Sequence, residues 1–245
     1  MSTSGEFGMR VDMAPGFPLP VSFSIPFSRG CMRDVADIRI AQDGEDVPAQ
    51  FHVLNVWDDG SLKWVQGVTR VSGAFRVLYN QGRHAGDIPH PVQAFYDGAS
   101  ASLTCENVAL RVDLETCVAT FLHGDRSLRF SLSQVTSSNG DLFRAGYGTA
   151  EVLENGPLRG RIRVRGDHQN DAEKRFMRFD VFVSLYAGVP ILEITHVLGV
   201  NDVAQSEFLA FSALDIPIEL GNGNEINRAY ALTEDGQQCP LPMQG

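Results

Sequence analysis

Apolar and polar residues alternate along most of the chain, which is the period-2 pattern of β-strands that bury one face. Residues 21–27 alternate apolar side chains with serines, and residues 74–79 repeat the pattern after a Ser-Gly turn. No long stretch shows the helical period of 3.6 residues. The pattern therefore predicts an all-β protein.

Two Asp-Gly turns indicate hairpins in the first third of the chain. Asp43-Gly44 separates strands predicted at 37–41 and 47–54, and Asp59-Gly60 separates strands predicted at 53–57 and 61–68. Asp-Gly between apolar runs is a strong short-range hairpin signal. Short strands spaced about ten residues apart are typical of a small barrel, which we expect to end near residue 93.

A second series of strands follows. The pattern predicts a hairpin from 109–114 and 117–122, long strands at 158–164, 176–186 and 191–200, and a strand near 208–219. Residues 137–140 and 166–171 are expected to form polar loops. We therefore predict two domains, a barrel at 1–93 and an antiparallel β-sandwich at 94–245.

The register of one predicted hairpin follows from its apolar faces. These faces match only if Leu185 lies opposite Leu192, because a slip by one residue would place Val183 opposite Glu193 on the core side. In this register His196 points into the core.

Charge and composition narrow the classes of partner. The net charge of −10 disfavours nucleic acid, and no apolar run of about 18 residues is present to span a membrane. The first eight residues lack the basic and apolar regions of a secretory signal. We expect a cytoplasmic protein, one released by another route such as cell lysis, or a processed piece. The four cysteines form no C-x-x-C pair, so we expect reduced thiols, no zinc site and no cofactor.

Several strings resemble the N-terminal half of the exo-rhamnogalacturonan lyase (YetA-like) family. They include Gly16-Phe17-Pro18, residues 21–30, Val47-Pro48-Ala49-Gln50, Trp57-Asp58-Asp59-Gly60-Ser61-Leu62-Lys63-Trp64, Glu154-Asn155-Gly156-Pro157-Leu158-Arg159-Gly160 and residues 186–196. The resemblance implies a RIFT-like β-barrel followed by a β-sandwich. In that family an α/α toroid follows and is expected to carry the lyase site. This chain stops at Gly245, so we expect no catalytic residue of the family here.

Two aromatic residues flank the second Asp-Gly turn. Trp57 and Trp64 offer rigid faces on which sugar rings can stack, and Lys63 could pair with a uronate carboxylate. The alternative is that both indoles pack against the barrel and that Lys63 is solvated.

Arginines alternate with apolar residues on one predicted strand. Arg161, Arg163 and Arg165 share the face opposite Ile162 and Val164, and Arg159 extends the row. Guanidinium groups bind carboxylates in a bidentate manner, so this cationic stripe could bind an acidic polysaccharide. Alternatively, the arginines pair across strands with acidic residues such as Glu151, Glu193 and Asp180.

A β-eliminating lyase would need a base and a group that neutralises the substrate carboxylate. The predicted loop at 166–171 holds His168, Asp167 and Asp171, and Tyr186 and Arg178 lie farther along the chain. Their spacing does not support a catalytic site. It also lacks the ordered ligand pattern of an EF-hand loop.

Three functional hypotheses follow. The first is a non-catalytic, carbohydrate-associated β module that binds acidic glycans. The second is a structural or receptor-binding component of a virion or another assembly, for instance as a homo-oligomer. The third is a part of a polysaccharide lyase that is completed by a separate chain carrying the toroid.

Overall fold

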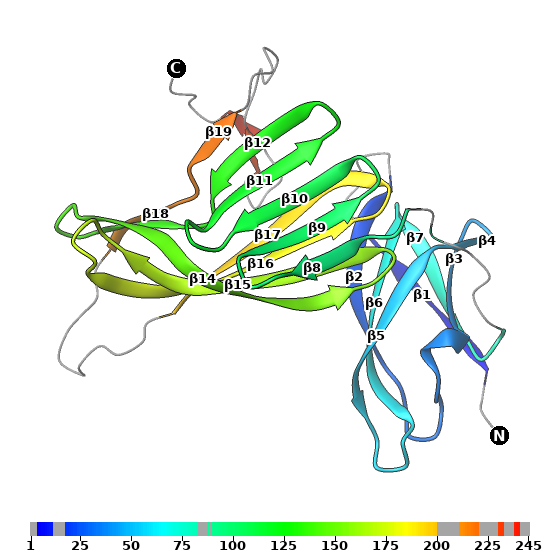
Figure 1. Cartoon of the computed structure of the whole chain (residues 1–245). Helices are drawn as coiled ribbons and strands as arrows, with labels where there is room; N and C mark the ends of the chain where they lie inside the picture. Colours follow the sequence, from blue (N-terminus) through cyan, green and yellow to red (C-terminus); the bar gives the residue numbers. More distant parts are fainter. Residues whose placement is uncertain are drawn as a thin grey trace.

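The computed structural model describes residues 4–11, 18–82, 88, 90–199, 211–220, 230–232 and 238–240. Within these ranges the chain consists of β-strands, apart from loops and one short 3-10 helix at Val35–Asp37. A compact N-terminal module lies beside a longer, two-layered C-terminal module (Figure 1). The all-β prediction is confirmed. Among the described residues, no helix is long and apolar enough to cross a membrane.

The N-terminal module contains seven of the described strands in two sheets. They are β1 (Gly5–Arg10), β2 (Leu19–Pro26), β3 (Ile38–Gln42), β4 (Glu45–Val47), β5 (Ala49–Val56), β6 (Leu62–Val71) and β7 (Ala74–Tyr79). One sheet has the order β1-β7-β3-β4 and the other β2-β6-β5. Their inward side chains, among them Ile25, Ile40, Val65 and Val77, form one apolar core.

In the first hairpin the Asp43-Gly44 turn forms as predicted, but the strand predicted after it is wrong. Asp43 and Gly44 both have positive φ, 53° and 90°, as a tight two-residue hairpin turn requires. The partner strand predicted at 47–54 is two strands, because β4 ends at Val47 and β5 begins at Ala49 in the other sheet. Pro48 lies between them and has no N–H to donate to a ladder.

The C-terminal module stacks two long sheets. Its strands are β8 (Gln93–Tyr96), β9 (Ser100–Cys105), β10 (Val108–Asp113), β11 (Val118–His123), β12 (Arg126–Ser131), β13 (Gln134–Ser137), β14 (Leu142–Asn155), β15 (Arg159–Gln169), β16 (Arg175–Tyr186), β17 (Val189–Gly199), β18 (Phe211–Asp215) and β19 (Ile218–Leu220). The sheet orders are β19-β12-β11-β10-β9-β8 and β17-β16-β15-β14-β13-β18. A separate short pair joins β20 (Tyr230–Leu232) to β21 (Gln238–Pro240).

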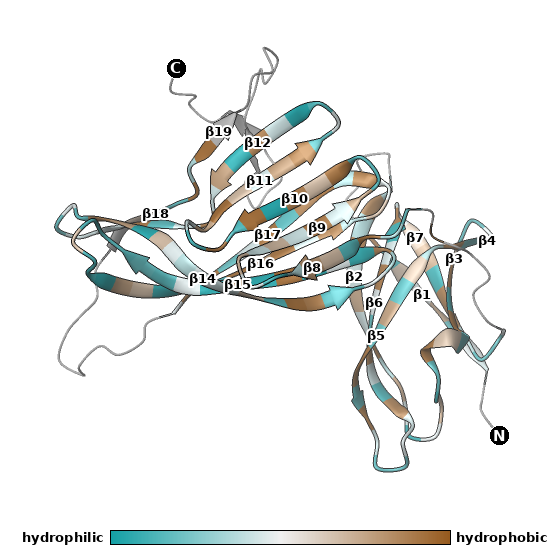
Figure 2. Cartoon of the chain, in the orientation of Figure 1, coloured by the Kyte–Doolittle hydropathy of each residue, from teal (hydrophilic) through white to brown (hydrophobic). Residues whose placement is uncertain are grey.

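Apolar side chains from both sheets meet between the layers, and the alternation of apolar and polar residues is visible along the strands (Figure 2). The predicted register is confirmed, since Leu185 lies opposite Leu192. His196 lies opposite Val181, which is fully buried, and therefore faces the core as expected. The domain boundary at residue 93 stays a prediction.

Two other predictions for this module were wrong. β15 continues to Gln169, so most of the polar loop expected at 166–171 is strand. The single strand expected near 208–219 is two strands among the described residues, β18 in one sheet and β19 in the other. Pro217 lies between them, where a residue without an N–H can end one strand before the chain crosses to the facing sheet.

Candidate functional site

The outer face of the sheet β14–β17 carries a row of arginines. Arg161, Arg163 and Arg165 alternate along β15 with buried residues, so they point away from the core as strand periodicity predicts. Arg161 also lies over the ring of Phe182 on β16, with 5.0 Å between guanidinium carbon and ring centroid. The stripe is therefore present from Arg161 to Arg165.

A groove runs along this face, and we call it the arginine groove. Its volume is about 500 Å³, within the range of small-ligand sites. The charged residues lining it are Arg163, Arg165, Arg175, Arg178, Asp167 and Asp180, an excess of two positive charges. Arg175 and Arg178 come from β16, which sequence reasoning did not connect to the stripe. The groove is thus locally cationic on a protein of net charge −10.

Carboxylates within and beside the arginine groove pair with its arginines. Arg163 donates to Asp180 at 2.6 Å, and the Asp180 carboxylate raises the pKa of Arg163. Asp167 is shared, because Arg175 and Arg178 approach it at 3.2 and 3.3 Å. Such pairs agree with the alternative interpretation of the stripe, in which the arginines pair with acidic residues across strands.

The pair with the most exposed carboxylate lies at the edge of the groove. Arg165 reaches Glu151 at 3.3 Å, and both side chains are about half exposed. A guanidinium has five N–H donors, so one contact with a carboxylate oxygen leaves donors for a second acceptor. Pairing within the groove is therefore compatible with binding an additional carboxylate.

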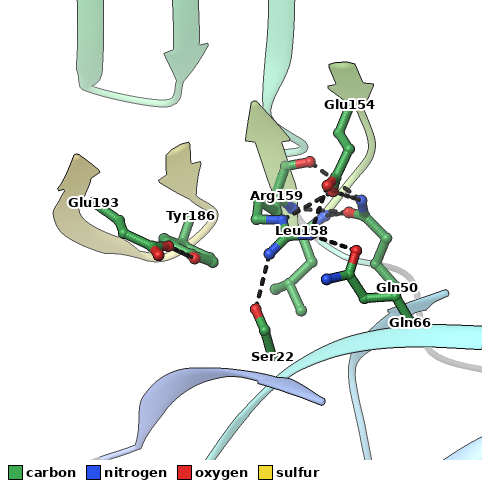
Figure 3. Close-up of polar contacts among 8 residues, drawn as sticks. All are labelled: Ser22, Gln50, Gln66, Glu154, Leu158, Arg159, Tyr186 and Glu193. Carbon is green, nitrogen blue, oxygen red and sulfur yellow. Dashed lines mark hydrogen bonds and ion pairs between the residues drawn. The ribbon is translucent and has the colours of Figure 1, made fainter. Parts of the chain in front are cut away.

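Arg159 does not belong to this surface, which corrects the four-arginine stripe. Its residue is only 2% exposed, and it forms a bidentate pair with Glu154 at 2.6 and 2.8 Å. Burial lowers the pKa of Arg159, but the Glu154 carboxylate and Tyr186 together more than offset this, so the net pKa is raised. The guanidinium also donates to Ser22 on β2 at 2.8 Å (Figure 3). Arg159 thus joins the two modules and is closed to a ligand.

Gln50 on β5 completes this junction, as Figure 3 shows. Its side-chain oxygen accepts the backbone N–H groups of Leu158 and Arg159 at 3.0 and 2.8 Å. Its nitrogen donates to Glu154 at 3.2 Å. A Cβ at Gly156 would lie 2.3 Å from the Gln50 side chain, so only glycine permits this approach. We call the cluster of Ser22, Gln50, Glu154 and Arg159 the interdomain junction.

Two family models match the chain. The PcRGLX-like N-terminal RIFT barrel domain matches residues 10–84, and the PcRGLX-like protein central beta sandwich domain matches residues 114–236, half of the chain. The chain belongs to the PcRGLX-like family. The resemblance to rhamnogalacturonan lyase-like proteins is thereby confirmed for both modules. No curated protein matches the chain.

Membership of the PcRGLX-like family relates this chain to carbohydrate-associated β modules. Two of the strings that carried the resemblance meet at the interdomain junction, since one contains Gln50 and the other contains Glu154, Gly156 and Arg159. These two strings therefore hold residues that join the modules. The matches lend no support to the virion hypothesis.

The two tryptophans beside the second Asp-Gly turn have different surroundings. The Trp57 indole donates its N–H to the Phe27 carbonyl at 3.0 Å, and the Lys63 ammonium lies 4.4 Å from the centroid of its ring. Trp64 is 40% exposed. All three residues belong to the N-terminal module and none lines the arginine groove. Glycan binding by Trp57, Lys63 and Trp64 stays a prediction.

His168 does not occupy a polar loop, because it lies on β15 inside the sandwich and is fully buried. Its Nδ1 is 2.9 Å from the Met177 carbonyl and must donate to it, which leaves Nε2 to accept from the Ser133 hydroxyl at 2.7 Å. The Ser133 oxygen then accepts from His196 Nε2, also at 2.7 Å. We call Ser133, His168 and His196 the buried histidine cluster.

The catalytic roles considered for His168 and Tyr186 do not fit this geometry. His168 is closed to substrate, while burial and the neighbouring Glu193 raise the pKa of Tyr186 to about 12. A general base works best with a pKa near the working pH. Within the described ranges, no group of three or more His, Cys, Asp or Glu side chains could hold a metal ion.

The buried histidine cluster predicts loss of stability in mild acid. Burial lowers the pKa values of both His168 and His196 below the ordinary 6.5. The unfolded chain therefore binds protons first as the pH falls below 6.5, and the folded state loses up to about 1.4 kcal/mol per pH unit for each histidine. Urea unfolding at a series of pH values checks this. The decrease in the free energy of unfolding per pH unit should be smaller in His196→Leu than in the wild type. It should be unchanged in the control His52→Gln, because His52 is exposed on β5. A wild-type free energy of unfolding that does not change with pH below 6.5 would contradict the prediction.

Proposed function

We propose that the chain is a carbohydrate-associated module that binds acidic polysaccharide along the arginine groove. The observation that carries the proposal is the convergence of four arginines from β15 and β16 in one groove of about 500 Å³. Membership of the PcRGLX-like family supports a carbohydrate as the ligand. The excess of arginine over aspartate in the groove favours a uronate over a neutral sugar.

The chemistry of the groove fits uronate carboxylates. Guanidinium groups offer planar, paired N–H donors that match a carboxylate, and the groove aligns several of them along two neighbouring strands. Exposed ion pairs such as Arg165–Glu151 contribute only about 0–1 kcal/mol each, so a ligand carboxylate can compete for them. We therefore expect modest affinity that depends strongly on salt.

Replacing Arg165 and Arg175 together by glutamine should weaken binding of polygalacturonate about tenfold at low salt. Both side chains are at least half exposed, so their removal should leave the fold intact. Two exposed charge contacts of up to about 1 kcal/mol each account for this size. Isothermal titration at about 20 mM and about 300 mM NaCl measures it, and the wild-type affinity should fall over the same range because salt screens exposed charges.

The matched control is Arg29→Gln/Arg76→Gln. Both arginines are more than half exposed and form ion pairs in the N-terminal module, with Asp59 and Glu6. This control changes the net charge by the same amount, so it should retain wild-type affinity. If both double variants lose the same affinity, binding depends on overall charge and not on the arginine groove. If the wild type does not bind uronate polymers, the proposal is excluded. Native mass spectrometry would test the remaining hypotheses of a homo-oligomer or a separate toroid chain.

A further inference from the structure

Tyr147 stands out on the surface of the sandwich. The residue is 71% exposed, the largest exposure among the bulky apolar and aromatic residues of the described ranges. Its φ is +49°, in the left-handed region that a residue with a Cβ adopts at a cost. Neither burial nor backbone preference therefore explains a tyrosine here, where glycine would fit better.

A β-bulge in β14 places this residue. Pairing with β15 shifts register between Gly146 and Thr149, so the chain leaves the ladder at Tyr147 and Gly148. Their N–H groups instead donate to the carbonyls of Glu115 and Leu114 in the facing sheet's β10–β11 turn, at 2.9 and 2.7 Å. Two backbone bonds thus hold the bulge, and neither involves the phenol ring.

The bulge lies where two cavities meet. Gly146, Tyr147 and Gln169 line both the arginine groove and a second cavity of about 670 Å³. In the second cavity Arg129 and Arg144 are outnumbered by three acidic residues, Glu115, Asp171 and Glu173. The cationic surface therefore ends at Tyr147, and the cavity beyond it is not suited to a uronate.

We propose that Tyr147 is a sugar-stacking platform at the end of the arginine groove, where its ring supports a pyranose ring of an acidic oligosaccharide. This inference rests on the proposed function, because it takes the groove to hold the same ligand. An exposed aromatic face next to charge-bearing donors combines apolar contact with carboxylate binding. The bulge fixes the position of the platform, so the ligand does not have to order a mobile loop.

The test uses the full chain and hexagalacturonate, with Tyr147→Gly, Tyr147→Phe and the Arg165→Gln/Arg175→Gln variant. Tyr147→Gly removes the ring but suits the positive φ, so its thermal midpoint should not fall. Its affinity should drop about tenfold, the scale of one aromatic contact. Tyr147→Phe keeps the stacking face and should bind within about twofold of wild type.

The salt dependence of binding separates the stacking contribution of Tyr147 from the charge contribution of the arginines. Stacking is not screened, so the loss in Tyr147→Gly should be the same at low and high salt, whereas the loss in the arginine variant should shrink as salt rises. If wild type binds and Tyr147→Gly binds equally well, the platform is refuted and the proposed function stands. A fall in the thermal midpoint of Tyr147→Gly would assign the ring a packing role and likewise refute the platform. If wild type does not bind hexagalacturonate at low salt, the proposed function fails and the platform with it.

Discussion

Replacing Arg159 by methionine should lower the free energy of unfolding by about 3–5 kcal/mol. The substitution keeps much of the side-chain volume but leaves the Glu154 carboxylate, whose side chain is only 11% exposed, without its bidentate partner. It also leaves Ser22 without the guanidinium that donates to its hydroxyl oxygen. An uncompensated buried charge is among the most costly defects in a protein. Urea unfolding followed by circular dichroism measures the loss.

Two companion variants make this prediction specific. Arg165→Met removes an exposed arginine of the same strand as Arg159, β15, which pairs with Glu151 on β14, and it should cost less than about 1 kcal/mol. Arg159→Met/Glu154→Leu removes both buried charges and should recover a large part of the loss, because no carboxylate then remains unpaired. A cost below about 1 kcal/mol for Arg159→Met alone would contradict the interdomain junction described above.

Local sequence patterns predicted the fold well wherever one physical rule governs a segment. Matching of apolar faces placed Leu185 opposite Leu192, and the structure has this pair. The Asp43-Gly44 signal worked because its two positive φ angles suit few other residues. In both cases the deciding contacts are close in sequence.

Long-range packing could not be predicted in the same way. Alternation along β15 gives Arg159 the same face as Arg161, but Glu154 on β14 and Ser22 of the N-terminal module enclose Arg159. His168 sits in a polar sequence, and it is buried because Ser133 and the Met177 carbonyl satisfy its ring nitrogens. Such partners are distant in sequence, so composition alone predicted a loop.

Only part of the arginine groove was predicted, because its residues come from two strands and their pairing is a long-range feature. One strand supplied Arg163 and Arg165, whereas Arg178 joins them only through the β15–β16 register that sets it opposite Asp167. Alternation with Met177 and Phe179 was a signal that could have placed Arg178 on the outer face. The Gly146-Tyr147-Gly148 sequence inside a strand is likewise a bulge signal.

Replacing Ser133 by alanine should cost about 2–6 kcal/mol, although only one oxygen atom is removed. Ser133 is fully buried where the chain passes from β12 in one sheet to β13 in the other. Its hydroxyl donates to His168 and accepts from His196, so alanine leaves two buried ring nitrogens unpaired at about 1–3 kcal/mol each. The free energy of unfolding at pH 7.5 measures the effect in a range where both histidines are neutral.

Ser100→Ala is the matched control, because Ser100 is also buried and its hydroxyl donates to Asp97 at 3.1 Å. After this substitution the Asp97 carboxylate still accepts the backbone N–H groups of residues 99 and 100. It should cost less than about 1.5 kcal/mol. In a His196→Leu background, Ser133→Ala leaves only His168 unpaired, so its cost should fall by about half. Equal costs in the two backgrounds would show that His196 and Ser133 are not coupled. The cluster would then be a single His168–Ser133 bond, with His196 stabilised by packing alone.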